Sequence, residues 1–521
     1  MTAQHKKRWE AFALVAILCV AAGLRLYRIQ DEPVWYDEVV STVAFDQPTL
    51  GKFFEEFRSN DPTAVPFYFT LEYAFVRCTG GGVLAARILS VFLSLATIAL
   101  LYTLGRYLFG GTAGLVAAAL LTLSRTHIYF SQEIRMYALL LPLALLSMLT
   151  FIAALNSKRR ALWAINVLVN ACIVWTHLFG CLLLLTEGLF MLFFSGPRAF
   201  RRTFLWTLAH LPFFAPLALW LTASRLRHME IATAWISMPS WNTLFDHYFY
   251  YCTGSGWVFG FTDCLATHVP FLPSHALPGL FMLAASGWLV VWTFRHRVRT
   301  TFLRNASGAW SLKLRSRFAI PRSARHLPGY NPRSIFFLIV VFLLPPLLLF
   351  AISFAVRPYF VGRYVFYPCF PFCVLAGAGA AIVPRGWMRI AAITLLLGSL
   401  ALLLPDLRRP LRSDISTASR IISDFGHHGD FIFVGDNTQK AQLAVEGVVT
   451  DAKIRCGETY LEDALVAVES GYDSWVIMST NASFSVARFD EKLQHRGYEY
   501  DLYKIPGRVP VALFKIIPYQ D

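Results

Sequence analysis

The chain has 521 residues, of which 56% are hydrophobic and only 15% are charged, and its mean hydropathy is +0.51. A soluble globular protein is excluded, because no soluble fold buries that much apolar surface. Repeated runs of about twenty apolar residues indicate a polytopic membrane protein instead. The net charge of +15 does not indicate nucleic-acid binding, since the basic residues lie in short clusters between apolar runs, as in topology signals.

The apolar runs predict eleven membrane spans, with the N-terminus in the cytoplasm and the C-terminus outside. Three basic residues, Lys6, Lys7 and Arg8, precede the first run, and such residues favour the cytoplasmic side. The apolar segment 63–76 is short for a span, and if it crossed the membrane all later basic clusters would move outside. We therefore expect it to lie along the outer interface. The predicted spans are 11–29, 85–108, 111–128, 136–155, 161–176, 178–195, 203–222, 276–294, 334–356, 364–383 and 387–405.

This topology divides the chain into two domains. Residues 1–405 form the predicted membrane domain, and residues 406–521 form a small extracytoplasmic α/β domain, because short β-rich runs alternate there with helical patterns. No phosphate-binding loop, nucleophile elbow or metal-ligand spacing occurs in that second part. Within the membrane domain the main predicted loops are the outer loops 30–84, 126–137 and 224–275 and the basic cytoplasmic loop 295–333.

Three acidic residues lie on the predicted outer face. Asp37 and Glu38 follow the first span, and Glu133 lies in the second outer loop. Carboxylates at a membrane interface are costly unless they bind a cation, accept a proton or are solvated, so an exposed acidic turn is the simpler alternative for the pair. We take all three as candidate catalytic residues. The cofactor is left open, with a divalent metal ion held by Asp37 and Glu133 as the candidate.

Several basic and aromatic residues share this face. The positive-inside rule disfavours outer arginines, and binding an anionic group such as phosphate would explain them. Arg135 could instead pair with a neighbouring acid, and His177 could be an ordinary interfacial histidine. Glu187, in the middle of the sixth predicted span, either lines the cavity or is a buried structural acid. The candidate substrate-binding residues are Arg87, Arg135, Tyr137, Arg363, Tyr364, Tyr68 and His177.

Carboxylates and arginines at the rim of a membrane bundle suit group transfer from a phospholipid carrier. A lipid phosphate leaves readily when cations stabilise it, and the attacking hydroxyl needs a carboxylate to accept its proton. A single base opposite the leaving group predicts one displacement with inversion of the anomeric configuration. A lipid-linked glycan polymerase or ligase could use similar arginines. A lipid or solute transporter would show matched repeats in its two halves, which we do not find.

Four stretches together resemble a known family. They are Trp35 to Glu38, Pro66 to Phe69, Arg87 to Ser90 and Tyr129 to Tyr137, and they resemble the GT-C membrane glycosyltransferases. The similarity is greatest to family 39, the dolichyl-phosphate-mannose–protein mannosyltransferase-like proteins, which include lipid A aminoarabinose transferases. In one departure, many relatives have His-Pro-Pro-Leu-Tyr where this chain has Thr63 to Tyr68.

The resemblance implies a mechanism and a set of residues. Asp37 matches the catalytic or metal-associated acid of the first outer loop, with Glu38 beside it; Glu133 matches the acid of the second loop, and Arg87 the arginine that opens the second span. It implies transfer of a hexosyl or pentosyl group from a polyprenyl-phosphate sugar to a lipid, glycan or protein acceptor. We expect a multi-pass protein of the bacterial plasma membrane, since no endoplasmic-reticulum retrieval signal ends the chain.

Overall fold

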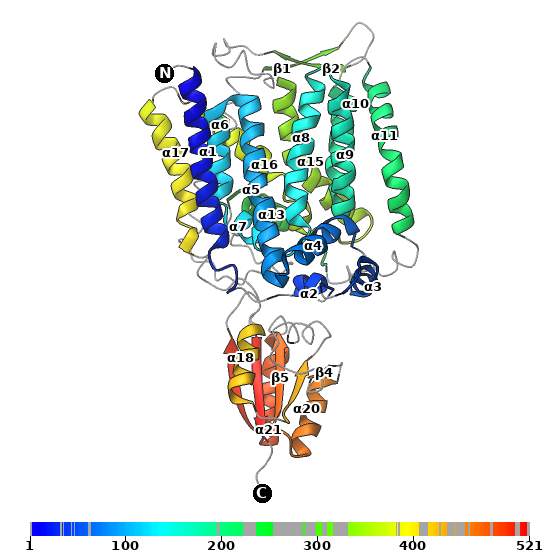
Figure 1. The fold of residues 1–521 in the computed structure, drawn as a ribbon, viewed down its shortest axis with the longest axis vertical. Coiled ribbons are helices and arrows are strands. Elements are labelled where there is room, and N and C mark those ends of the chain that lie inside the picture. Colours follow the sequence, from blue (N-terminus) through cyan, green and yellow to red (C-terminus); the bar gives the residue numbers. More distant parts are fainter. Residues whose placement is uncertain are drawn as a thin grey trace.

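The computed structural model combines a helical bundle with a small α/β domain at one of its ends (Figure 1). The N-terminus lies at the opposite end of the bundle. The residues it describes, apart from a few isolated positions, are 3–31, 36–42, 47–60, 64–194, 198–221, 236–253, 299–304, 310–315, 332–381, 386–405, 415–426, 429–434, 454–456, 459–479, 483–505 and 511–517.

Ten of the eleven predicted spans correspond to helices in the described residues. Five helices are long and apolar enough to cross a membrane, and α6 with α7 gives a sixth, bent by 68°. The predicted span 276–294 lies almost entirely outside the described residues. The ten elements are α1 (Ala3–Leu26), α5 (Gly82–Phe109), α6 (Gly111–Leu123) with α7 (Arg125–Ser131), α8 (Tyr137–Leu155), α9 (Arg160–Thr176), η1 (Leu178–Gly180) with α10 (Cys181–Phe194), α11 (Ala199–Trp220), α15 (Pro332–Ala355), α16 (Cys369–Ala381) and α17 (Gly386–Ala401).

Short helices cover the end of the bundle that is nearest the C-terminal domain. They are α2 (Tyr36–Thr42), α3 (Leu50–Asn60) and α4 (Pro66–Thr79) (Figure 1). The predicted interfacial segment is therefore helical, but it begins three residues later than expected. Pro66 occupies the first helical position, where its missing N–H costs nothing, and Gly80 ends the helix at φ 66°. At 14 residues, α4 is too short to cross a membrane.

The predicted second outer loop, 126–137, is mostly the helix α7. Ser124 ends α6 and caps α7, because its side-chain oxygen accepts a hydrogen bond from the His127 amide at 3.4 Å. Two other segments lie in predicted loops. Helix α13 (Trp241–Thr253) lies in the outer loop 224–275, and the hairpin of β1 (Arg299–Arg304) and β2 (Trp310–Arg315) lies in the basic loop 295–333.

Helix α6 packs against its neighbours through glycines. A Cβ on Gly114 would come within 2.5 Å of the Tyr102 carbonyl oxygen of α5. A Cβ on Gly377 of α16 would come within 2.4 Å of the Ala113 carbonyl oxygen of α6. Only glycine permits backbones to approach this closely, as in membrane helix pairs with small residues at the contact. Helix α6 is thus enclosed between α5 and α16.

Glu187 is a buried structural acid in a network of amide and hydroxyl groups. Its Oε2 accepts hydrogen bonds from Asn170 at 2.9 Å and Asn166 at 3.3 Å, and its Oε1 lies 2.7 Å from the Ser147 hydroxyl. The Trp206 indole donates to Asn166 Oδ1 at 2.8 Å. These contacts join α8, α9, α10 and α11, and they satisfy polar groups that would otherwise be stranded in an apolar bundle.

The C-terminal domain is a five-stranded mixed sheet with helices. The strand order is β4-β3-β5-β7-β6; β3 pairs in parallel with β4 and β5, and β7 pairs antiparallel with β5 and β6. Trp475 is fully buried, and its indole donates to Asp430 Oδ2 at 2.9 Å. The elements are α18 (Ile415–Phe425), β3 (Phe431–Val434), β4 (Ile454–Cys456), α20 (Tyr460–Glu469), β5 (Ser474–Ser479), α21 (Ser483–Arg496), β6 (Glu499–Ile505) and β7 (Val511–Ile517).

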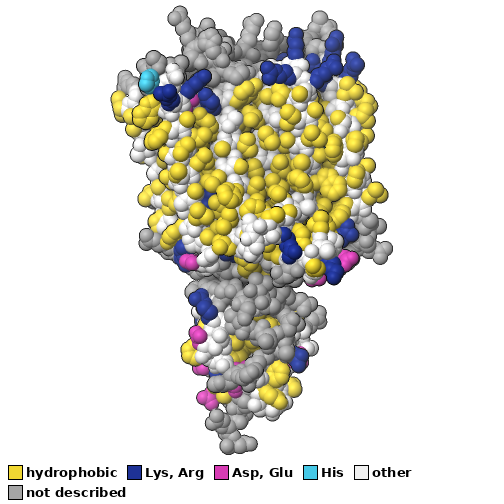
Figure 2. All heavy atoms as spheres, in the orientation of Figure 1, with side chains coloured by type: hydrophobic (Ala, Val, Ile, Leu, Met, Phe, Trp, Pro, Cys, Tyr) yellow, Lys and Arg dark blue, Asp and Glu magenta, His cyan; other side chains and the backbone are white. Residues whose placement is uncertain are grey.

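Charge is distributed unequally between the two ends of the bundle. Figure 2 shows hydrophobic side chains covering the side of the bundle, with lysines and arginines concentrated at the rim that faces away from the C-terminal domain. Exposed basic residues at helix ends include Lys158 and Arg159 before α9 and Arg201 and Arg202 in α11. By the positive-inside rule this rim would face the cytoplasm.

This charge distribution generates a topology prediction. In a background without native cysteines, Ser470→Cys should react with an impermeant thiol reagent added outside intact cells, and Ser157→Cys should not. Both side chains are exposed, so accessibility within the fold does not limit either reaction. Permeabilised cells supply the control, in which both positions should be labelled. Labelling of Ser157→Cys in intact cells would contradict the assigned orientation.

Candidate active site

The candidate site begins at a buried ion pair. Glu38 is fully buried in α2, and its Oε2 accepts a hydrogen bond from Arg87 Nη2 of α5 at 3.1 Å. Its Oε1 accepts the amide N–H of Ile134 at 2.9 Å. Arg87 Nη1 donates to the carbonyl of Ile29 at 2.8 Å. Glu38 and Arg87 therefore join α2, α5, the residues after α1 and the turn before α8, and hydrogen bonds of this charge-assisted kind are stronger than neutral ones.

The segment held by Glu38 carries two further predicted residues. Glu133 and Arg135 flank Ile134 and are both buried, and Tyr137 begins α8 immediately after them. The Ser90 hydroxyl of α5 donates to the Glu133 carbonyl at 2.7 Å. Hydrogen bonds from α2 and α5 thus fix the backbone of this turn, and its side chains lie at the N-terminal end of α8.

Four of the predicted substrate-binding residues lie around a fifth, His177. Its ring centroid lies 4.9 Å from that of Tyr364 and 5.6 Å from that of Tyr137. The Arg363 guanidinium carbon lies 5.8 Å from the centre of the Tyr137 ring, within cation–π range. Burial lowers the pKa of His177 to about 3, and the positive charges of Arg135 and Arg363 add to that effect. His177 is consequently neutral at physiological pH, and the two arginines are the cations of this cluster.

Tyr68 is hydrogen-bonded to a buried acid, Glu72, that the sequence analysis did not single out. Its hydroxyl donates to Glu72 Oε1 at 2.8 Å, one helical turn away on α4, and both side chains are fully buried. Glu72 Oε2 has no hydrogen-bond partner among the described residues. Burial raises the pKa of Glu72 to about 8; the hydrogen bond from Tyr68 and the charge of Arg135 oppose the increase, and Glu38 adds to it. The only sequence signal was one acid in an apolar helix.

Asp37 lies in α2, next to Glu38, but its side chain is outside the described residues. Its assignment as the catalytic acid therefore stays a prediction. The metal assignment stays a prediction as well: the described side chains contain no group of three histidines, cysteines or acids arranged to hold a metal ion, and Asp37 is not among them.

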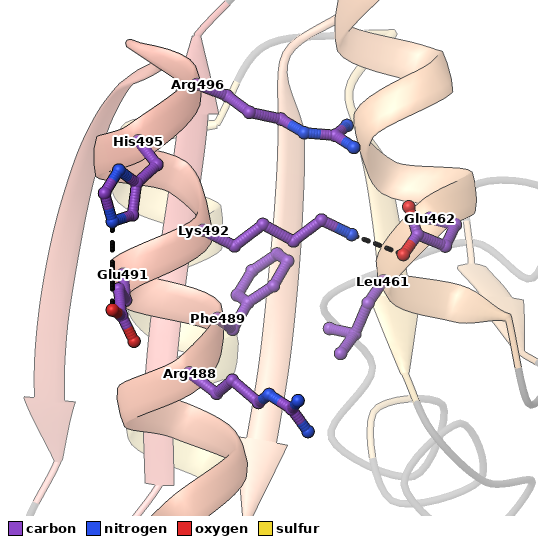
Figure 3. Close-up of a pocket in the computed structure, with 8 residues that line it drawn as sticks. All are labelled: Leu461, Glu462, Arg488, Phe489, Glu491, Lys492, His495 and Arg496. Atoms are coloured by element: carbon purple, nitrogen blue, oxygen red, sulfur yellow. Dashed lines mark hydrogen bonds and ion pairs between the residues drawn. The ribbon is translucent and has the colours of Figure 1, made fainter.

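The C-terminal domain has a shallow cleft of its own, of about 560 Å³, between α20 and α21 (Figure 3). Lys492 forms an ion pair with Glu462, and His495 Nε2 lies 3.8 Å from Glu491 Oε1. Such solvated pairs contribute little to stability. The cleft belongs to the small domain and contains none of the predicted site residues. It is lined by Leu461, Glu462, Arg488, Phe489, Glu491, Lys492, His495 and Arg496.

Comparisons with known proteins show what the chain is similar to. Residues 62–220, which run from the start of α4 to the end of α11, match the family described as dolichyl-phosphate-mannose-protein mannosyltransferase. The archaeal oligosaccharyltransferase AglB from Archaeoglobus fulgidus shares the fold, with a TM-score of 0.50 and 11% identity over 99% of this chain and 75% of that one. The family match covers residues 62–220 only, and the likeness to AglB, at 11% identity, concerns the fold.

A second solved structure also matches. ArnT from Cupriavidus metallidurans, solved with undecaprenyl phosphate bound, matches with a TM-score of 0.47 and 11% identity over 98% of both chains. No curated protein matches the sequence of this chain. The family match over residues 62–220 and the fold shared with AglB support the resemblance that the motifs indicated.

The buried ion pair between Glu38 and Arg87 can be tested by unfolding. Glu38→Gln leaves the Arg87 charge buried without its partner, so it should cost about 3–5 kcal/mol. Adding Arg87→Met should recover part of that loss. The measurement is unfolding in detergent by increasing denaturant. Asp31→Asn is the matched control: it removes the exposed Arg28–Asp31 pair and should cost less than about 1 kcal/mol. Equal losses for the two acids would contradict the structural role of Glu38.

The pKa of Glu72 predicts a pH-dependent stability difference. Between about 4.5, its ordinary value, and about 8, the unfolded chain releases a proton that the folded protein retains. Folding stability should therefore fall as the pH rises through this window, by up to about 1.4 kcal/mol per pH unit. Glutamine does not titrate, so Glu72→Gln lacks this pH-dependent loss of stability. Its melting temperature relative to that of wild type should therefore increase from pH 5 to pH 8.

The control for this prediction is Glu55→Gln, which changes an exposed acid of the neighbouring helix α3. Its melting temperature should follow that of wild type across the same pH range in the same detergent. A constant difference between Glu72→Gln and wild type from pH 5 to pH 8 would show that the Glu72 carboxyl does not titrate as expected.

Proposed function

We propose that the chain transfers a sugar from a polyprenyl-phosphate donor to an acceptor hydroxyl, at the outer face of a bacterial plasma membrane. The observation that carries the proposal is the pair of buried arginines, Arg135 and Arg363, beside a neutral His177. Buried guanidinium groups are suited to a phosphate, which they can bind with paired hydrogen bonds. The AglB structure, which has the same fold, was solved with dolichol-phosphate, and this supports a lipid-phosphate donor.

The chemistry assigned to the arginines is stabilisation of the leaving group. As the bond between the anomeric carbon and the phosphate oxygen breaks, negative charge develops on the phosphate. Fixed cations in a site of low polarity stabilise that charge without reorganising. The aromatic rings of Tyr137 and Tyr364 lie within 6.5 Å of each other between their centroids and border the same cluster, so they can exclude water from it.

A carboxylate accepts the proton of the attacking hydroxyl. Asp37 is our first choice for this base, because Glu38 already binds Arg87 and the Ile134 amide with its two oxygens. Glu133 is the second choice. A divalent metal ion held by Asp37 and Glu133 would lower the pKa of the acceptor hydroxyl. With one base and a direct displacement, the anomeric configuration of the sugar inverts.

The outer turn before α16 provides the test of the donor site. Arg363→Lys keeps the charge but loses the paired hydrogen bonds, so it should raise the KM for a polyprenyl-phosphate sugar by an amount corresponding to about 1–3 kcal/mol. Arg363→Ala should raise it further, and the KM for the acceptor should change little in either variant. The assay is sugar transfer by the purified protein at varied donor and at varied acceptor concentration.

Two further variants in the same assay complete the design. Arg357→Ala changes a partly buried arginine of the same turn and should leave the donor KM unchanged. Asp37→Asn should lower kcat by about 10² or more, if Asp37 is the base or a metal ligand. A donor requirement for a lipid diphosphate would favour a glycan polymerase or ligase instead. Dependence on an ion or substrate gradient would favour a transporter. An unchanged donor KM in both Arg363 variants would contradict the phosphate role.

A further inference from the structure

Helix α1 contains a fully buried arginine that the site does not use directly. Arg25 lies in the last turn of this apolar span, and none of its side chain is exposed. A charged side chain at such a position is costly unless the protein satisfies all of its hydrogen-bond donors. The contacts of Arg25 therefore indicate why an arginine occupies this position.

Every N–H of the Arg25 guanidinium has an acceptor. Nε donates to the Ser94 hydroxyl at 2.7 Å, and Nη1 to the carbonyls of Ala21 and Thr122, each at 3.2 Å. Nη2 donates to the Leu121 carbonyl at 3.3 Å and to His127 Nδ1 at 2.7 Å. A guanidinium has five N–H groups, and all five are engaged. Arg25 consequently has no donor left for a substrate phosphate.

Three of these acceptors lie at the bend between α6 and α7. Leu121 and Thr122 belong to the last turn of α6, where the bend ends the regular helical hydrogen bonding; the Leu121 carbonyl also accepts the Ser124 amide at 3.3 Å. His127 lies in the first turn of α7. Because arginine only donates, His127 Nδ1 must carry a lone pair, which makes this histidine neutral with its proton on Nε2.

The backbone of the same residue holds the other end of α7. Gln132 directly follows α7, and its Nε2 donates to the carbonyls of Arg25 at 2.8 Å and Tyr27 at 2.9 Å. Glu133 is the next residue, followed after Ile134 by Arg135. Both ends of α7, and with them the start of the segment that carries these two site residues, are bound to the end of α1.

We propose that Arg25 is a positioning residue, which fixes the bend between α6 and α7 and so sets the position of Glu133 and Arg135. Its effect on catalysis depends on the proposed function, whereas its effect on the order of the segment 132–136 does not. Lysine cannot replace it: an ammonium has three N–H donors, so at least two of the five acceptors lose their partner.

The experiment compares local order with turnover. In Arg25→Lys, amide hydrogen exchange of residues 125–136 should become at least about tenfold faster, while the amides of α15 and of the C-terminal sheet keep their protection. Turnover at saturating donor and acceptor should fall by about tenfold or more, because small displacements of catalytic groups are costly. The matched control is Arg106→Gln, which removes another contact between α5 and α1, the Arg106–Glu10 pair at 3.3 Å near the opposite end of both helices. It should change neither quantity.

A pair of variants at His127 decides the matter should Arg25→Lys fail to fold. Asn places an oxygen near the position of Nδ1 and can accept from Arg25, whereas Leu cannot. His127→Asn should therefore keep turnover and loop protection within about threefold of wild type, and His127→Leu should lose both as Arg25→Lys does. Wild-type protection in Arg25→Lys, or equal behaviour of the two His127 variants, would overturn the proposal.

The two proposals fail in different ways. Suppose that Arg25→Lys loses exchange protection in residues 125–136 while the wild-type protein consumes no polyprenyl-phosphate sugar. The proposed function would then be wrong, and the positioning role of Arg25 would still be supported. Suppose instead that Arg363→Ala loses donor turnover while hydrogen exchange in Arg25→Lys is unchanged. The proposed function would then be supported, and the positioning role of Arg25 would be wrong. The exchange measurement uses the full chain in detergent without any substrate.

Discussion

The ion pair between Glu38 and Arg87 is the contact on which the end of the bundle nearest the C-terminal domain depends. Charges in surroundings of low polarity must be paired or hydrogen-bonded, and these two side chains are almost completely buried. Because each also binds a backbone group, the pair determines where α2, α5, the end of α1 and the turn before α8 lie relative to one another. The ion pair joins residues 49 positions apart, and the hydrogen bond from Ile134 to Glu38 joins residues 96 positions apart.

The apolar surroundings also determine which groups of the site are charged. His177 is neutral at physiological pH, since burial and two nearby arginines lower its pKa to about 3. Glu72 is mostly protonated there, since burial raises its pKa to about 8. The neutral histidine therefore adds no positive charge to that of Arg135 and Arg363, and the protonated acid adds no negative charge. Of these four side chains, only the two guanidinium groups therefore carry a charge at that pH.

The parts of this fold that the sequence predicted are those that depend on local composition. Apolar runs are read directly along the chain, so ten spans, the interfacial helix and the C-terminal α/β domain correspond to described helices and strands. The sequence placed Arg135, His177 and Arg363 on the same predicted face of the bundle, and in the structure these three residues lie close together. The helix α7 was missed because its start depends on one cap, Ser124, in an otherwise apolar stretch.

What the sequence could not indicate are contacts between distant residues. The hydrogen bonds from Arg25 to Ser94 and His127 span 69 and 102 positions, and hydropathy treats a single arginine in an apolar run as a minor interruption. The sequence analysis did not identify Glu72 for the same reason, since its role depends on the hydrogen bond from Tyr68 and the charge of Arg135. The strand order β4-β3-β5-β7-β6 likewise depends on pairings that no local pattern encodes.

The glycine contacts of α6 have a mechanical consequence. With the Gly114 and Gly377 backbones this close to the carbonyls of α5 and α16, α6 can neither rotate about its axis nor slide without a steric clash. A rigid helix thus ends at Ser124, and a short helix of seven residues begins directly afterwards. The turn that carries Glu133 therefore follows a short helix whose start is set by a rigid neighbour at Ser124 and whose end is held by Gln132 against α1.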